Sequence, residues 1–246
     1  MDLNNVRIED TILPFYIIAA ALVVMGILYY FAPLPEIKAA GEDESDTASN
    51  ASAFASTKTS IFQFPHLLLG VVAIFFDVGV EYVALGSIND YATILNLKSP
   101  QNYVWLVSIG MILGYIAGVL FIPKYISQVT ALLSSTITAI AVTITIMILP
   151  AYISIYLVGV LGLANAMMWP AIWPMAIADL GRFTKTGSSL LVTGLIGGAF
   201  LPLAFGYAAD QSSYQVAYSV CLPAYFFIMY YAIWGHKIRT KTKSNH

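Results

Sequence analysis

Long apolar runs separated by short polar links make up most of the chain. The first run, Ile12–Phe31, is long enough to cross a bilayer as a helix and has no signal-peptide cleavage pattern, so we expect it to be retained. After a long polar stretch, six further runs follow, at about 64–88, 103–122, 129–149, 152–177, 188–207 and 214–234. The pattern therefore predicts an all-α membrane protein with seven spans, divided as one plus six.

The polar stretch after the first run has a composition of its own. Glu36–Ser60 is rich in Ala, Ser, Thr, Asp and Glu, with the acidic segment Gly41–Asp46 at its centre. Such a composition cannot bury a core and is typical of a disordered linker. We therefore expect three parts: a single helix in 1–31, an acidic linker at 32–61 and a six-helix part at 62–246.

Composition supports the membrane class and argues against several others. Hydrophobic residues make up 59% of the chain, charged residues 10%, and the mean hydropathy is +0.79, whereas soluble domains are about one quarter charged. No basic run is interleaved with aromatic residues, so nucleic acid is not an expected partner. The chain has one cysteine and three histidines without ligand spacing, so a metal site is not expected. It contains no nucleophile, phosphate-loop or dinucleotide motif, so an enzyme is not expected either.

Lysine and arginine are distributed unevenly between alternate links. With seven spans, one side of the membrane receives only Arg7 and Lys98. The other side receives the remaining nine of the eleven basic residues, namely Lys38, Lys58, Lys124, Arg182, Lys185, Lys237, Arg239, Lys241 and Lys243. Because positive charge favours the cytoplasmic side, the linker and the C-terminus are predicted to be cytoplasmic and Met1 to lie outside.

Two Trp-Pro pairs lie within one apolar run and form the most distinctive motif of the chain. At 100° per residue, Asn165, Trp169 and Trp173 advance by about 40° at each step, so they form one stripe. The proline after each tryptophan removes a backbone donor and predicts a kink beside the stripe. An amide, aromatic rings and a bent backbone suit a sugar ring, which has hydroxyls at its rim and C–H groups on its faces. The alternative is that the tryptophans are core or interfacial anchors.

Asp77 and Glu81 lie near the middle of the run at 64–88. They are four residues apart and therefore share one helical face. A charged carboxylate at a helix centre costs about 2.5–3.5 kcal/mol, so both should face a cavity or a partner helix. As close like charges they should titrate as a pair that keeps at least one proton, which makes them candidates for proton coupling. The alternative is a structural hydrogen bond to another helix.

Glycines recur at helical spacing in two of the runs. Gly110, Gly114 and Gly118 repeat at every fourth residue, and a later run contains Gly194, Gly197, Gly198 and Gly206. Small residues on one face allow a neighbouring backbone to approach closely. We therefore interpret both sets as helix-packing positions.

Three segments resemble the fucose permease-type sugar:proton symporters of the major facilitator superfamily, most of all the glucose/galactose transporter branch. They are Phe75–Glu81, Ile122–Gln128 and Gly162–Leu191. The resemblance covers roughly 62–235, while Ile12–Phe31 and the linker match the sixth helix and the central loop of the family. It implies two six-helix halves, alternating access, a sugar site between the halves and a proton gradient as energy source, with no cofactor.

The resemblance also suggests roles for individual residues. Glu81 matches the acidic position of the family's seventh helix, and the Asn165–Trp169–Trp173 stripe matches its tenth, so these four are the expected sugar-binding residues. The cytoplasmic link after that helix, an expected gate, is matched by Asp179, Arg182 and Lys185. Two features depart from the family: Asp77 stands where an aromatic residue is expected, and the first five family helices have no counterpart.

We therefore expect the C-terminal portion of a hexose transporter, specific for glucose, galactose or a fucose-like sugar, in a bacterial inner membrane. The expected partners are the sugar, the lipid bilayer and an N-terminal transporter half. Two alternatives are a non-transporting remnant or accessory membrane subunit, and a half-transporter that pairs with a second copy of itself.

Overall fold

A computed structural model describes residues 8–31, 55, 58–122 and 124–238, and every regular element in this part of the chain is helical. The chain divides into two compact units, Met1–Lys38 and Ala39–His246. Most of the linker predicted at 32–61 lies outside the described residues. The prediction of an all-α protein is confirmed.

The first unit contains helix α1 (Ile8–Phe31). Its described side chains are exposed, for example Tyr16, which is 70% accessible, and Leu22, which is 67% accessible. The apolar segment that the structure describes here, Tyr16–Leu28, is shorter than a full span. The predicted first span is therefore helical, but the described part of its apolar segment does not reach the length of the other six.

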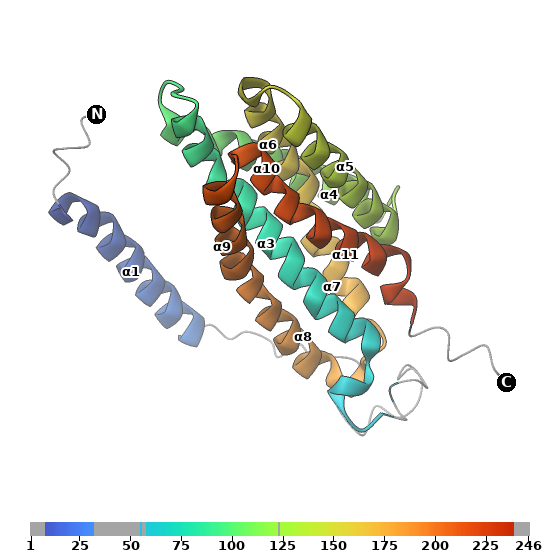
Figure 1. Cartoon of the computed structure of the whole chain (residues 1–246). Helices are drawn as coiled ribbons and strands as arrows, with labels where there is room; N and C mark the ends of the chain where they lie inside the picture. The colour runs from blue at the N-terminus through green and yellow to red at the C-terminus, as the bar shows by residue number, and fades with distance from the viewer. Residues whose placement is uncertain (1–7, 32–54, 56–57, 123, 239–246) are drawn as a thin grey trace. The chain divides into compact units, whose positions relative to one another are not determined.

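The second unit contains six segments that are long and apolar enough to cross a membrane (Figure 1). They are α3 (Pro65–Ile94); η3 with α4 (Pro100–Asn102, Val104–Phe121); α5 (Gln128–Ile148); α6 with α7 (Ala151–Ala166, Met168–Ile177); η4, α8, η5 and α9 (Gly181–Phe183, Thr184–Thr193, Gly194–Ile196, Gly197–Gln211); and α10, η6, α11 and η7 (Tyr214–Ala217, Tyr218–Val220, Cys221–Ile233, Gly235–Lys237). A short 3-10 turn, η2 (Ile61–Gln63), precedes α3. All six predicted spans of this part are thus confirmed.

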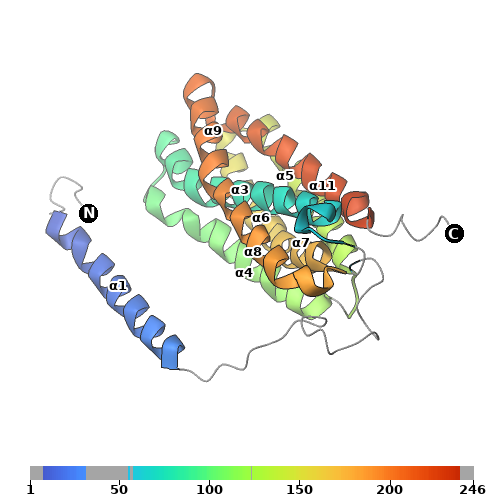
Figure 2. The same cartoon turned by 90° about the horizontal axis from the view of Figure 1, so that it is seen from below.

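Helix α3 is the centre of the six-helix bundle. It contacts α4, α6, α7, α8, α9 and α11, and it runs alongside α9 and α11 in both views (Figures 1 and 2). It continues beyond the predicted end at residue 88, and Asn89 near this end accepts a 3.0 Å hydrogen bond from the Val104 amide at the start of α4. The side chain of Asn89 thus supplies an acceptor for an amide that the first turn of α4 leaves unpaired.

Close backbone contacts confirm most of the glycine-packing prediction. A Cβ at Gly110 would come within 2.2 Å of the Gly159 carbonyl oxygen, so α4 and α6 touch backbone to backbone. Gly197 of α9 lies as close to α3, where its Cβ would be 1.8 Å from the Phe75 carbonyl oxygen. The prediction is wrong for Gly206, whose Cβ would meet nothing within 4 Å, and for Gly118, whose Cβ would make only an ordinary contact with Met167.

At the first Trp-Pro pair, where a kink is predicted, the helix is interrupted at one residue, Met167. Helix α6 ends at Ala166, and α7 begins at Met168. Because residue 170 is a proline, the Ala166 carbonyl has no amide donor four residues ahead, which explains why the helix is interrupted at this point. Pro174 remains inside α7, which continues to Ile177.

Candidate functional site

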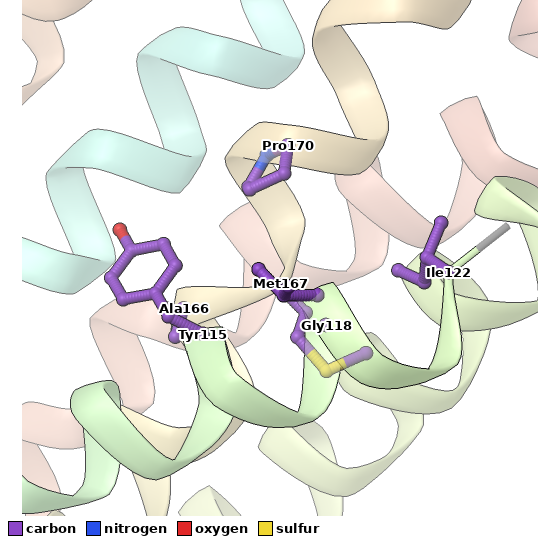
Figure 3. A pocket seen from close by; sticks show the side chains of 7 residues that line it. Tyr115, Gly118, Ile122, Ala166, Met167 and Pro170 are labelled. Atoms are coloured by element: carbon purple, nitrogen blue, oxygen red, sulfur yellow. The ribbon is translucent and has the colours of Figure 1, made fainter.

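A cavity of about 200 Å³ opens where the break separates α6/α7 from α4. Figure 3 shows Tyr115 extending from α4 with its hydroxyl toward the α3 ribbon. Met167 and Pro170 lie opposite, on the α6/α7 segment. At Gly118 a Cβ would meet only the Met167 Cγ, at 3.7 Å, so the tight packing of α4 against α6 has ended here. The cavity is lined by Tyr115, Gly118, Val119, Ile122, Ala166, Met167 and Pro170.

Asn165 lies just before the break and points into the bundle interior. It is 1% exposed, and its amide oxygen accepts a 3.0 Å hydrogen bond from the Tyr225 hydroxyl of α11. Its Nδ2 has no hydrogen-bond partner among the described residues. The structure thus leaves a buried amide donor available beside the broken helix.

The two tryptophans of the stripe stack on each other. The ring centroids of Trp169 and Trp173 are 5.3 Å apart at 30°, and both side chains are half-buried against the core. The cavity is lined instead by Ala166 and Pro170, which point about 100° and 140° away from Asn165 around the helix. The stripe and the cavity therefore occupy neighbouring faces of the broken helix, and sugar binding by the stripe stays a prediction.

Asp77 is fully buried on the inner face of α3. Neither carboxyl oxygen has a hydrogen-bond partner within the described part of the chain, so the structural hydrogen bond considered as an alternative is not formed there. The Tyr225 hydroxyl lies within electrostatic range of this carboxyl group, and that hydroxyl is bonded to Asn165. An isolated ionised carboxylate is far more costly to bury than a protonated one, so this position suits a carboxyl group that carries a proton.

Glu81, one turn further along α3, is only half-buried. The Tyr115 hydroxyl on α4 lies within electrostatic range of both Glu81 and Asp77. The two carboxyl groups of the predicted pair thus have different surroundings: Asp77 is enclosed, whereas Glu81 is partly exposed. Neither lines the cavity; Tyr115, which does, links the cavity to the pair.

Sequence reasoning missed Tyr115 and Tyr225. A signal existed for Tyr115, which directly follows Gly114 and therefore points away from the face that packs on α6. For Tyr225 the signal is weaker: a buried tyrosine hydroxyl normally finds a hydrogen-bond partner, and Asn165 offers one. Neither residue could be assigned to the site without knowing which helices are neighbours.

The predicted gate residues lie in the link between α7 and α8. Asp179 adopts a left-handed backbone conformation with φ of 60°, and Lys185 is exposed in the first turn of α8. The Arg182 guanidinium donates a 2.9 Å hydrogen bond to the Lys58 carbonyl, ahead of α3. His66 of α3 donates from Nε2 to the Ala178 carbonyl at the end of α7, also at 2.9 Å. These bonds tie the link to the start of α3, and none of the gate residues lines the cavity.

A second polar cluster joins α3, α6 and the last span. It lies near the end of α3 and near the starts of α6 and of the last span. The Tyr91 hydroxyl is bonded to Ser154, and the Gln215 amide donates to the Ile146 and Leu149 carbonyls.

Through the described ranges, no three His, Cys, Asp or Glu side chains are grouped so that they could hold a metal ion.

A bundle of six membrane-spanning helices, with one helix broken and carboxyl groups near its centre, has the architecture of one half of a major-facilitator transporter. The comparison with solved structures agrees. The chain superimposes on an Escherichia coli fucose:proton symporter with a TM-score of 0.72, at 19% identity, over 90% of this chain and 54% of that one. A structure of a major facilitator superfamily transporter in the outward conformation matches with a TM-score of 0.71, at 18% identity, over 95% and 59% of the two chains.

Relatives by sequence point to the same class. A glucose/galactose transporter of Brucella abortus is 28% identical over 243 residues, which cover 95% of this chain and 55% of the relative. The L-fucose-proton symporter of Escherichia coli is 21% identical over 238 residues, which cover 94% and 52%. No protein-family profile matches the chain. The resemblance to these sugar transporters is confirmed, and the chain spans about half the length of the curated relatives it matches.

Proposed function

We propose that this chain forms the C-terminal six-helix half of a hexose transporter that works by alternating access. The observation that carries the proposal is the similarity to a glucose/galactose transporter over 95% of the chain. Its relatives are transporters rather than enzymes, and a sugar of the glucose, galactose or fucose type is the corresponding substrate for this chain.

Proton coupling is the second element of the proposal. Glu81 is the carboxyl group suited to respond to both sugar and proton, because it is half-buried and within electrostatic range of Tyr115, which lines the cavity. Asp77 serves as an enclosed partner that carries a proton. The proton gradient is then the energy source, and no cofactor is required.

The arrangement in the membrane follows the distribution of charge. We place the protein in a bacterial inner membrane with the C-terminus and the acidic linker in the cytoplasm, because nine of its eleven Lys and Arg residues fall on that side. Residues 1–31 would contribute the last helix of the other half, residues 32–61 the connection between halves and residues 62–246 the six-helix half.

A sugar site between two halves needs a second bundle. We propose an N-terminal transporter half as its source, with a second copy of this chain as the alternative. A non-transporting remnant or an accessory membrane subunit would need no second half and would bind no sugar, so sugar binding distinguishes it from both.

The proposal is tested with the 246-residue chain in proteoliposomes. Equilibrium binding of D-glucose, D-galactose and L-fucose is measured first, and proton-gradient-driven uptake of the same sugars second. We expect saturable binding of at least one hexose when an N-terminal half is supplied, and no accumulation without it. Accumulation by this chain alone would favour self-pairing, and no binding of any hexose in the presence of an N-terminal half would overturn the proposed function.

A further inference from the structure

We propose that Tyr115 contacts the sugar and that the cavity at the helix break holds the C–H face of the hexose ring. This inference rests on the proposed function and adds to it a residue and a subsite that neither the motifs nor the comparisons assign. The observations that support it are that Tyr115 lines the cavity and that its hydroxyl lies within electrostatic range of Glu81 and Asp77.

The cavity is created by two features that come together only in the fold. Closer to the start of α4, Gly110 and Gly114 hold it against the α6 backbone, where a Cβ would lie 2.2 and 2.6 Å from carbonyl oxygens. Beyond Gly114 this contact stops: a Cβ at Gly118 would meet only the Met167 Cγ, at 3.7 Å, where α6 gives way to α7. Pro170, Met167 and Gly118 then surround open space instead of packed side chains (Figure 3).

The chemistry of the cavity matches one face of a sugar ring. Aliphatic groups of Val119, Ile122 and Met167 form its walls and suit ring C–H groups. The Tyr115 hydroxyl provides a donor and acceptor at the edge. A ring with an apolar face and a polar rim suits this combination, whereas a lipid chain would leave the hydroxyl unused.

The size of the cavity is that of a partial site. Complete ligand pockets enclose about 300–1,000 Å³, and this one encloses about 200 Å³. One half of a transporter is expected to cover only one side of a ligand that sits between two halves. The remaining surface of the sugar would face the second half.

Two substitutions test the contribution of the Tyr115 hydroxyl and that of the cavity volume separately. Tyr115→Phe keeps the ring and removes one hydrogen-bonding group, so we expect hexose affinity to fall roughly three- to tenfold. Gly118→Leu fills the cavity and should weaken binding more than tenfold, whereas Gly118→Ala should have little effect, because its Cβ would make only an ordinary contact with Met167. Tyr152→Phe is the matched control, since Tyr152 is 64% exposed and lies outside the cavity.

A labelling experiment tests occupancy directly. In a Gly118→Cys variant, hexose should slow the reaction of the new thiol with a small methanethiosulfonate reagent, while the native Cys221 is buried and contributes little background. A Ser212→Cys variant, in the exposed link before α10, should react at the same rate with and without sugar.

The outcomes distinguish this inference from the proposed function. If the parent chain binds hexose but Tyr115→Phe and Gly118→Leu bind it equally well, and sugar does not protect the thiol at position 118, the cavity is not the subsite and the proposed function stands. If the parent chain binds no hexose even when an N-terminal half is supplied, both are overturned. Weakened binding by both variants together with sugar-dependent protection at position 118 establishes the subsite.

Discussion

The Tyr225 hydroxyl donates a 3.0 Å hydrogen bond to the amide oxygen of Asn165, which joins α11 to the last turn of α6. Both side chains are almost completely buried, and the bond is formed one residue before α6 ends. The last span therefore holds the helix at the point where its own backbone bonding is interrupted. The remaining donor of the amide, Nδ2, is buried and has no hydrogen-bond partner among the described residues.

Replacing Tyr225 with Phe should destabilise the bundle. The substitution removes the bond and leaves a second buried polar atom of Asn165 without a partner, which costs about 1–3 kcal/mol. The midpoint of thermal unfolding in detergent should therefore fall relative to Tyr230→Phe, a control at a residue that is 41% exposed. Equal midpoints for the two variants would show that the bond contributes nothing to stability.

Replacing Asn165 with Ala should raise the hexose dissociation constant in the complete transporter. A sugar hydroxyl left without its partner costs about 1–3 kcal/mol, or roughly 5- to 150-fold in affinity. Trp169→Ala and Trp173→Ala should also weaken binding if the indoles contact the ring. Should all three variants fold and bind sugar like the parent, the stripe has only a structural role.

The two carboxyl groups of α3 should respond differently to neutralisation. We expect Glu81→Gln to impair sugar binding and to remove its pH dependence, because Glu81 is half-buried and within electrostatic range of Tyr115, which lines the cavity. Asp77→Asn should have a milder effect, since it replaces an enclosed carboxyl group by a neutral group of similar shape. Sugar affinity is measured against pH for each variant, with expression level as the folding control. The opposite ranking would assign the coupling role to Asp77.

Two glycines of α9 offer a matched test of packing. In Gly197→Ala the new methyl group would be 1.8 Å from the Phe75 carbonyl oxygen, so α9 must move away from α3 at a cost of at least about 1–3 kcal/mol. In Gly206→Ala the methyl group meets nothing within 4 Å, and the higher helix propensity of alanine should stabilise by up to about 1 kcal/mol. Thermal unfolding midpoints should shift in opposite directions; a similar shift for both would refute the contact at Gly197.

The positions of the six spans of the bundle follow from hydropathy alone, because a bilayer imposes a length and an apolar composition on each helix. The break in the fourth of these spans was also predictable from Pro170, since the missing amide acts within the same helix. The direction in which the Asn165 stripe faces could not be predicted from the sequence. Helical geometry fixes which residues share a face, but the neighbour that covers this face depends on contacts such as the one with Tyr225, sixty positions away.

The dependence on contacts between helices also explains the other differences between the predictions and the structure. Gly206 fits the spacing of a packing glycine, yet no helix lies against it, and only the arrangement of neighbouring helices decides this. Tyr115 carries no motif and becomes a candidate only because the glycines before it bring α4 against α6. Helical spacing places Asp77 and Glu81 on one face but does not give their burial; in the structure Asp77 is fully buried, whereas Glu81 is only half-buried.

The isolated carboxyl group of Asp77 has a consequence for how the protein is made. The ribosome produces α3 before any other helix of the bundle, whereas α11, which carries Tyr225, is produced last. During synthesis, α3 must therefore enter the membrane with Asp77 uncovered, at a cost of about 2.5–3.5 kcal/mol on insertion scales. The long apolar sequence of α3 compensates for this cost until later helices enclose the carboxyl group. Insertion of the nascent chain thus depends on apolar residues of α3 that the finished transporter would not need for binding.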